Sequence, residues 1–189
     1  MPAVPDPASV IQVCLAEFGK LRDEIAGRSG TVWTLMGLNA TVSSAVAGFV
    51  LARQASPLLF LLLPLLSPSL GLLLIDHATN IGNIGSYIDG HLKPLLQEAA
   101  GEPRLLQYEE WVDRYEEQPL RRLLPFGIPL VLLFNVVPVG ALVYTLPRLT
   151  TSWSWFLWVL GLAVTSVQVA FWVGFLWPPL RRALRRTTS

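Results

Sequence analysis

The sequence has few charged residues, and this shortage excludes an ordinary soluble protein. Charged residues make up 14% of its 189 residues and hydrophobic residues 52%, whereas soluble domains contain about 25% charged residues. The composition therefore indicates a membrane protein. The formal net charge is only +1, which gives no reason to expect a polyanionic partner, so nucleic acid is not an expected ligand.

Cysteine and the common catalytic motifs are also scarce or missing. The single cysteine, Cys14, cannot form an internal disulfide, and its place on an apolar helix face favours a buried residue over a reactive thiol. The sequence contains no G-x-S-x-G elbow, no G-x-x-x-x-G-K phosphate loop, no H-E-x-x-H pair and no paired cysteines. An enzyme is therefore disfavoured, and no cofactor is expected.

What the sequence does contain is four apolar stretches without a charged residue. They lie at 31–52, 57–75, 126–146 and 153–177. At a rise of about 1.5 Å per residue, each spans or nearly spans a hydrocarbon core of about 30 Å. The connectors within the first and the last pair are short, which predicts two antiparallel hairpins. We expect an all-α, polytopic membrane protein with four transmembrane helices.

Two helical segments outside the spans are predicted to be amphipathic and cytoplasmic. The first runs from Pro7 to Gly27, with Asp6 as its cap and Gly27 as its stop, and its apolar face is expected to pack against protein. The second lies between spans two and three. The predicted regions are an N-terminal helix at 1–30, a first hairpin at 31–76, a cytoplasmic helical segment at 77–125, a second hairpin at 126–178 and a basic tail at 179–189.

The basic residues predict the orientation of the chain in the membrane. Arg53 and Arg148 lie in the two short connectors, and every other lysine and arginine lies before span one, between spans two and three, or after span four. Positive residues favour the cytoplasmic side, so both termini and the middle segment are expected on the cytoplasmic side of the inner membrane. Residues 1–8 carry no positive charge, and we expect no cleaved secretory signal.

The polar side chains at membrane depth are neutral, which argues against proton relays and carriers of charged substrates. Asn39, Asn135 and Gln168 are interpreted as interhelical hydrogen-bonding groups in preference to a pore lining. Prolines also occur within the spans and are interpreted as shaping helix packing. Small residues recur on one face of the first span and predict a homo-oligomer through close helix contact; they are Gly37, Thr41, Ser44 and Gly48.

The stretch "IDHATNIGNIGSYIDGHL" at 75–92 holds both histidines, His77 and His91. On a straight helix they stand about 21 Å apart, so they cannot share a metal ion, and no metal site is expected. The segment is predicted to be a helix with a polar stripe, an apolar stripe and a strip of small residues for close packing. The apolar stripe comprises Ile81, Ile84, Ile88, Leu92 and Leu95, and the small strip includes Gly82 and Gly85.

An acidic helical segment is predicted after this stretch, at about 105–117. One face is apolar and the other carries carboxylates, with Glu110 and Arg114 at a pairing distance. A solvated face is favoured over a site for a divalent cation or a basic partner.

The pattern formed by "LLLIDHA" and "IGNIGSYIDGHLKPLL" resembles a family of small, largely actinobacterial integral membrane proteins with an LDHA…IxxIGxYI…LxP pattern. The likeness covers roughly residues 15–115 and implies no particular activity. In architecture alone, the chain is also similar to four-span membrane effectors of bacterial antiphage and conflict systems, which are thought to disrupt or permeabilise the inner membrane.

The sequence favours a non-enzymatic membrane protein, an oligomeric pore-forming or membrane-perturbing effector or a membrane subunit of a complex. Its partners would be the lipid bilayer, further copies of the chain and a cytoplasmic protein or signal. The alternative is a small membrane enzyme acting on a lipid or isoprenoid at the cytoplasmic interface. Its catalytic residues would be Asp76, His77, Asp89 and His91.

Overall fold

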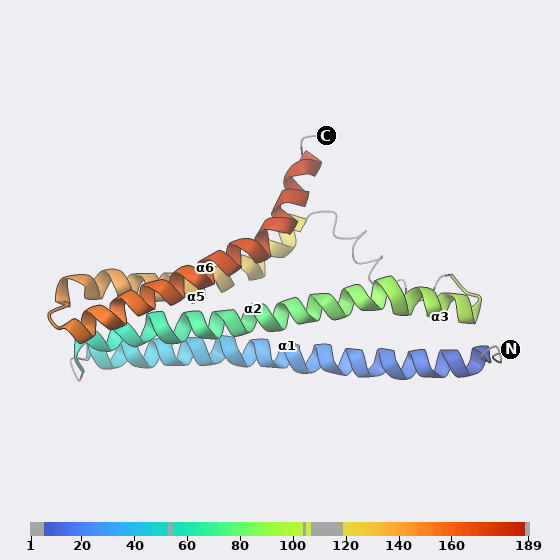
Figure 1. The fold of residues 1–189 in the computed structure, drawn as a ribbon, viewed down its shortest axis with the longest axis horizontal. Coiled ribbons are helices and arrows are strands. Elements are labelled where there is room, and N and C mark those ends of the chain that lie inside the picture. Colours follow the sequence, from blue (N-terminus) through green and yellow to red (C-terminus); the bar gives the residue numbers. More distant parts are fainter. Residues whose placement is uncertain (1–5, 53–54, 104, 107–118, 188–189) are drawn as a thin grey trace. The chain divides into compact units, whose positions relative to one another are not determined.

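The computed structural model describes residues 6–52, 55–103, 105–106 and 119–187, and these residues form helices and no strand (Figure 1). The predicted all-α class is confirmed. The elements in chain order are α1 (Pro7–Leu51), the 3₁₀ helix η1 (Pro57–Leu62), α2 (Leu63–Tyr87), the π-helical turn η2 (Ile88–Leu92), α3 (Lys93–Ala100), α5 (Pro119–Thr145), the 3₁₀ turn η3 (Leu146–Arg148) and α6 (Ser152–Thr187). Residues 107–117 of the predicted acidic helix at 105–117 fall outside the described residues, and residues 105–106 form a turn.

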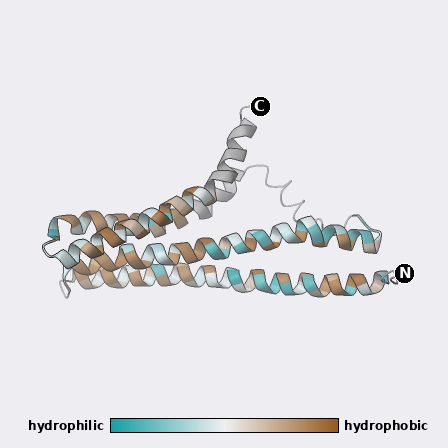
Figure 2. Ribbon diagram, in the orientation of Figure 1, coloured by the Kyte–Doolittle hydropathy of each residue, from teal (hydrophilic) through white to brown (hydrophobic). Residues whose placement is uncertain are grey.

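Within the described residues, four helices are long and apolar enough to cross a membrane. These candidate spans indicate a multi-pass membrane protein, and they coincide with the four apolar stretches of the sequence. Figure 2 shows the change along α1, where hydrophilic residues are frequent in the first half and sparse in the second. The helices that contain the spans are Ala8–Leu51, Pro57–Ala100, Pro129–Arg148 and Ser152–Phe175.

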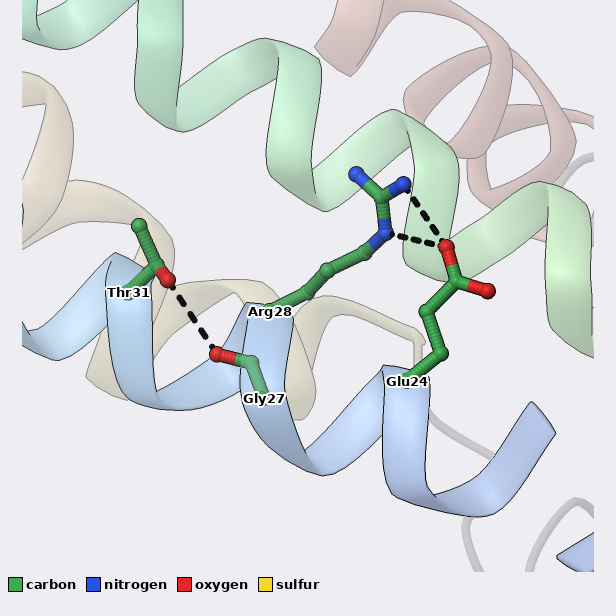
Figure 3. A network of polar contacts seen from close by, with 4 residues as sticks. All are labelled: Glu24, Gly27, Arg28 and Thr31. Atoms are coloured by element: carbon green, nitrogen blue, oxygen red, sulfur yellow. Dashed lines mark hydrogen bonds and ion pairs between the residues drawn. The ribbon is translucent and has the colours of Figure 1, made fainter. Parts of the chain in front are cut away.

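The predicted stop at Gly27 is wrong, because α1 continues through it to Leu51. A helix-ending glycine usually adopts a positive φ, but among the described glycines only Gly101, which follows α3, does so, with φ of 66°. Side chains also stabilise the helix on both sides of Gly27. Arg28 forms an ion pair with Glu24 at 2.7 Å, and Thr31 Oγ1 donates to the Gly27 carbonyl at 3.2 Å (Figure 3).

The described residues group into two compact units. The first unit lies within Met1–Val32 and His77–Glu117, and the second within Trp33–Asp76 and Gln118–Ser189. Each unit therefore combines segments that are distant in the sequence.

The first unit has an apolar core between α1 and the helical segment of η2 and α3. Cys14 is buried there, as predicted, and packs with Ile88, Leu92 and Leu96. The predicted apolar stripe is wrong at its end, because Leu95 is 51% exposed whereas Leu96 is 4% exposed. The π-helical turn accommodates one extra residue, which moves the buried position from 95 to 96.

The second unit begins its second span with a 3₁₀ helix. Ser56 caps it by accepting a hydrogen bond from Leu58 N at 3.3 Å, and Pro57 occupies the first helical position, where its missing N–H leaves no intrahelical bond unmade. The unit also has an apolar core of Val46, Leu63 and Ala141. Surrounding this core are the partly buried residues Val42, Leu59, Phe60 and Val137.

Candidate functional site

Asp76 and His77, two residues of the enzyme alternative, are neighbours in α2 but have different surroundings. Asp76 is exposed and His77 is half-buried. The His77 Nδ1 atom is enclosed and has no hydrogen-bond partner among the described residues. A general base must come within hydrogen-bonding distance of the proton it removes, and the enclosed Nδ1 atom is poorly placed to reach a substrate, which leaves Nε2 as the nitrogen of His77 that could do so.

Asp89 and His91, the other two residues of that alternative, lie on η2 and are exposed. The His91 ring stacks on the Tyr87 ring, with centroids 5.5 Å apart and planes at 13°. In the part of the chain that the structure describes, no three His, Cys, Asp or Glu side chains lie close enough to hold a metal ion. His91 thus contacts the aromatic ring of Tyr87.

Tyr87 also connects the two helical segments of the first unit. Its hydroxyl donates to Glu17 Oε1 on α1 at 2.8 Å. This hydrogen bond, followed by the negative charge of Glu17, raises the pKa of Tyr87 above its ordinary value, because both favour the neutral phenol. The sequence pattern placed Tyr87 on the polar stripe but gave no sign of Glu17, since seventy residues separate the two.

The small residues predicted for oligomerisation share an uncovered face of α1. Gly37, Thr41, Ser44 and Gly48 are all exposed. Among the described residues, no atom lies within 4 Å of a Cβ placed on Gly37 or Gly48. Within one chain, then, no described residue occupies this face.

Gly82 and Gly85, predicted to admit a neighbouring helix, likewise face open space. No described atom lies within 4 Å of a Cβ placed on either glycine. Close packing occurs instead at two glycines that the sequence pattern did not single out. A Cβ on Gly71 would collide with the Gln168 side chain and lie 3.2 Å from Phe134 Cδ1. A Cβ on Gly161 would lie 2.9 Å from Pro64 Cγ.

Prolines explain part of the hydrogen bonding inside the second unit. A proline has no N–H, so the carbonyl four residues before it loses its helical donor. Pro68 in α2 thereby frees the Pro64 carbonyl, and Pro138 in α5 frees the Phe134 carbonyl. Pro64, Pro68, Phe134 and Pro138 are all less than 2% exposed. In an apolar medium such carbonyls need another donor.

Those donors come from α6. Thr165 Oγ1 makes a long hydrogen bond of 3.5 Å to the Pro64 carbonyl. The Gln168 amide is assigned the orientation that satisfies both of its neighbours, in which its nitrogen donates to the Phe134 carbonyl at 3.2 Å and its oxygen accepts from Trp172 Nε1 at 3.1 Å.

A third donor of α6, Trp158 Nε1, donates to the Leu142 carbonyl at 2.9 Å. Leu142 lies in the last turn of α5, where carbonyls have no N–H donor within their own helix. We call Trp158, Thr165 and Gln168 the donor row. These three side chains tie α6 to carbonyls of α2 and α5.

The two asparagines at membrane depth behave differently from each other. Asn39 is 1% exposed, and its Nδ2 donates to the Leu133 carbonyl of α5 at 3.3 Å, so it bonds between helices. Asn135 Nδ2 instead donates within α5, to the Val131 carbonyl at 2.7 Å. Its Oδ1 is enclosed without a hydrogen-bond partner among the described residues.

Comparisons of the chain with protein families, with curated proteins and with solved structures find no match. The resemblances noted in the sequence therefore stay predictions, and the function is argued from the geometry. Chemically, the second unit offers neutral hydrogen-bonding groups inside and apolar side chains outside. The first unit offers an exposed group of Glu17, Tyr87 and His91.

Proposed function

We propose that this protein is a non-enzymatic, multi-pass inner-membrane protein that assembles into an oligomer and permeabilises or otherwise perturbs the membrane. Its four spans form two hairpins, with both termini and the amphipathic helices in the cytoplasm, as the distribution of lysine and arginine favours. Acting as the membrane subunit of a larger complex is the other form of the same proposal. The architectural likeness to four-span effectors of bacterial conflict systems supports it as an analogy.

The observation that carries the proposal is the division of α1 into two faces within the second unit. One face holds Asn39, Val46 and Val50, each at most 8% exposed. The opposite face holds the exposed small residues, Gly37 and Gly48 among them. Small residues let a second helix approach closely in a membrane, so this face is suited to a further copy of the chain.

The interior of a single chain supports an oligomer over a one-chain pore. Phe134 and Gln168 have no exposed surface and fill the space beside Gly71. Packing of this kind leaves little room for water between these three residues. Permeation through several chains, or disturbance of the lipid around them, fits this packing better.

Leakage of a dye from liposomes containing the purified protein tests the proposal. We expect leakage that rises steeply with protein density, and we expect Gly37→Leu with Gly48→Leu to reduce both the leakage and the crosslinked oligomer. Phe49→Leu, at an exposed position of the same helix and about 100° around it from Gly48, is the control. An oligomer and a leakage rate that are unchanged by the double substitution would contradict assembly through this face.

The enzyme alternative makes a different prediction in the same liposomes. Leakage by the non-enzymatic protein should be unaffected by Asp76→Ala and His77→Ala. The absence of leakage at every density, together with a lipid product detected by mass spectrometry and lost in these two variants, would replace the proposal with the enzyme.

A further inference from the structure

The interior of the second unit contains oxygen atoms that lack hydrogen-bond partners. Ser43 Oγ, Ser67 Oγ and Asn135 Oδ1 are enclosed, and none of them has a partner among the described residues. Ser67 is only 1% exposed. Unpaired buried oxygens are costly because they have given up water without receiving a protein donor. They therefore favour any state in which water reaches them.

Two of these residues are near neighbours in sequence of the apolar core of Val46, Leu63 and Ala141. On α1, Ser43 is between Asn39, which bonds the Leu133 carbonyl, and Val46, which packs in the cluster with Leu63. On α2, Ser67 is one helical turn after Leu63. The third residue, Asn135, lies in α5.

The α6 helix covers the segment of α2 that carries Ser67. Gly161 and Thr165 of α6 contact Pro64, and Gln168 contacts Gly71. Ser67 is located between Pro64 and Gly71 in the sequence of α2. Access to this segment from the α6 side thus requires the donor row to separate from its carbonyls.

Gln168 makes the most extensive of these contacts. Its amide bonds the carbonyl of Phe134 on α5 and accepts from Trp172 on its own helix, and it fills the space that the missing side chain of Gly71 leaves on α2. The 3.5 Å bond of Thr165 is weaker by geometry. Gln168 is consequently the residue whose removal should loosen α6 most.

We propose that Gln168 holds α6 closed over Ser67, and that movement of α6 away from Gly71 and Phe134 admits water to this oxygen and contributes, in each chain of the oligomer, to the permeabilising state. This inference rests on the proposed function. The open state is stabilised by hydration of Ser67 and its neighbours, and the closed state by the hydrogen bonds of Gln168. Ser67 and Gln168 are both neutral, so a change in their own protonation plays no part in this balance.

Reaction of a cysteine at position 67 with a small, water-soluble methanethiosulfonate reagent tests the opening directly. The protein carries Cys14→Ala and Ser67→Cys, is reconstituted in liposomes, and is compared with the same protein bearing Gln168→Leu. A membrane hydrogen bond of ordinary strength should bias the opening by about threefold to tenfold, so the labelling rate should rise by that factor. Ser166→Leu, on the exposed side of α6, should leave the rate unchanged.

A second variant allows the test to be made even if Gln168→Leu fails to fold. Gly71→Ala keeps Gln168 in the chain but adds a methyl group where the Gln168 amide lies. This variant should raise the labelling rate as well. Labelling that neither Gln168→Leu nor Gly71→Ala accelerates overturns the inference, whatever the leakage. Faster labelling without leakage from the liposomes leaves the opening intact and contradicts the proposed permeabilising function instead.

Discussion

The two units of the chain are built in opposite ways. The first unit places apolar side chains between its helices, around Cys14 and Leu92, and has its hydrogen bond from Tyr87 to Glu17 at an exposed edge. The second unit encloses Asn39 and Gln168 between its helices and exposes large apolar side chains. The exposed apolar residues of the second unit include Trp33, Phe49, Leu73, Leu132, Val143, Trp153, Phe156 and Phe171.

The contrast teaches which solvent each unit is built for. Burying apolar surface stabilises a fold only where the alternative is water. In lipid the apolar surface gains little from burial, and helix association depends on close packing and interhelical hydrogen bonds. The apolar core of the first unit is therefore of the kind that water stabilises, and the hydrogen-bonded interior of the second unit is of the kind that lipid stabilises. Three pairs of substitutions test this difference.

The largest effect is expected in the apolar core of the first unit. Leu96→Ala removes a side chain that is 4% exposed and should cost about 2–5 kcal/mol of unfolding free energy. Leu95→Ala, at a position that is 51% exposed, should change it by about 0.5 kcal/mol or less. Denaturant unfolding followed by circular dichroism measures both. Equal losses would mean that the π-helical turn does not set the buried position.

Smaller effects on the free energy of unfolding, opposite in sign, are expected at Gly71 and Gly82. Gly71→Ala places a methyl group against Gln168 and Phe134 and should destabilise the second unit by about 1–3 kcal/mol. Gly82→Ala meets no described atom within 4 Å and should stabilise its helix by about 0.8–1 kcal/mol. Unfolding in mixed detergent micelles gives the two free energies. The same sign for both variants would refute the close packing at Gly71.

The smallest effect concerns the exposed hydrogen bond of the first unit. Glu17 raises the pKa of Tyr87 in the folded protein. The hydrogen bond between them therefore contributes its full stabilisation of the fold below the ordinary tyrosine pKa of about 10. This contribution is lost as the pH rises through the raised pKa. Glu17→Gln should return the pKa of Tyr87 toward its ordinary value. Absorbance of the tyrosinate across an alkaline titration measures this, with Tyr87→Phe identifying the contribution of Tyr87.

The helical class and the four candidate spans could be predicted from the sequence because both follow from the length and apolarity of single segments. The end of α1 could not be placed from Gly27, because glycine permits a left-handed conformation without requiring it. The exposure of Leu95 depended on one π-helical turn, which a period of 3.6 residues cannot represent. In each of these two cases the local sequence allowed more than one structure.

The site was harder to predict because its contacts join distant segments. Gln168 was identified as an interhelical hydrogen-bonding residue, but its partners Gly71 and Phe134 belong to two other helices. One indication was present in the sequence. Pro68 and Pro138 each leave a carbonyl without a helical donor, and a search for donors among the remaining apolar stretches would have led to Thr165 and Gln168. Glu17 and Tyr87 gave no comparable indication.

The freed carbonyls also have a consequence for the order in which the chain is made. In the chain α2 and α5 precede α6, so the Pro64 and Phe134 carbonyls emerge from the ribosome before Thr165 and Gln168 do. Lipid tails have no hydrogen-bond donor for these carbonyls. Until α6 follows, the carbonyls therefore depend on water or on transient protein neighbours. A nascent chain that stops before residue 165 would present bare carbonyls to the insertion machinery and to membrane proteases, so the last span completes the biogenesis of the two that precede it.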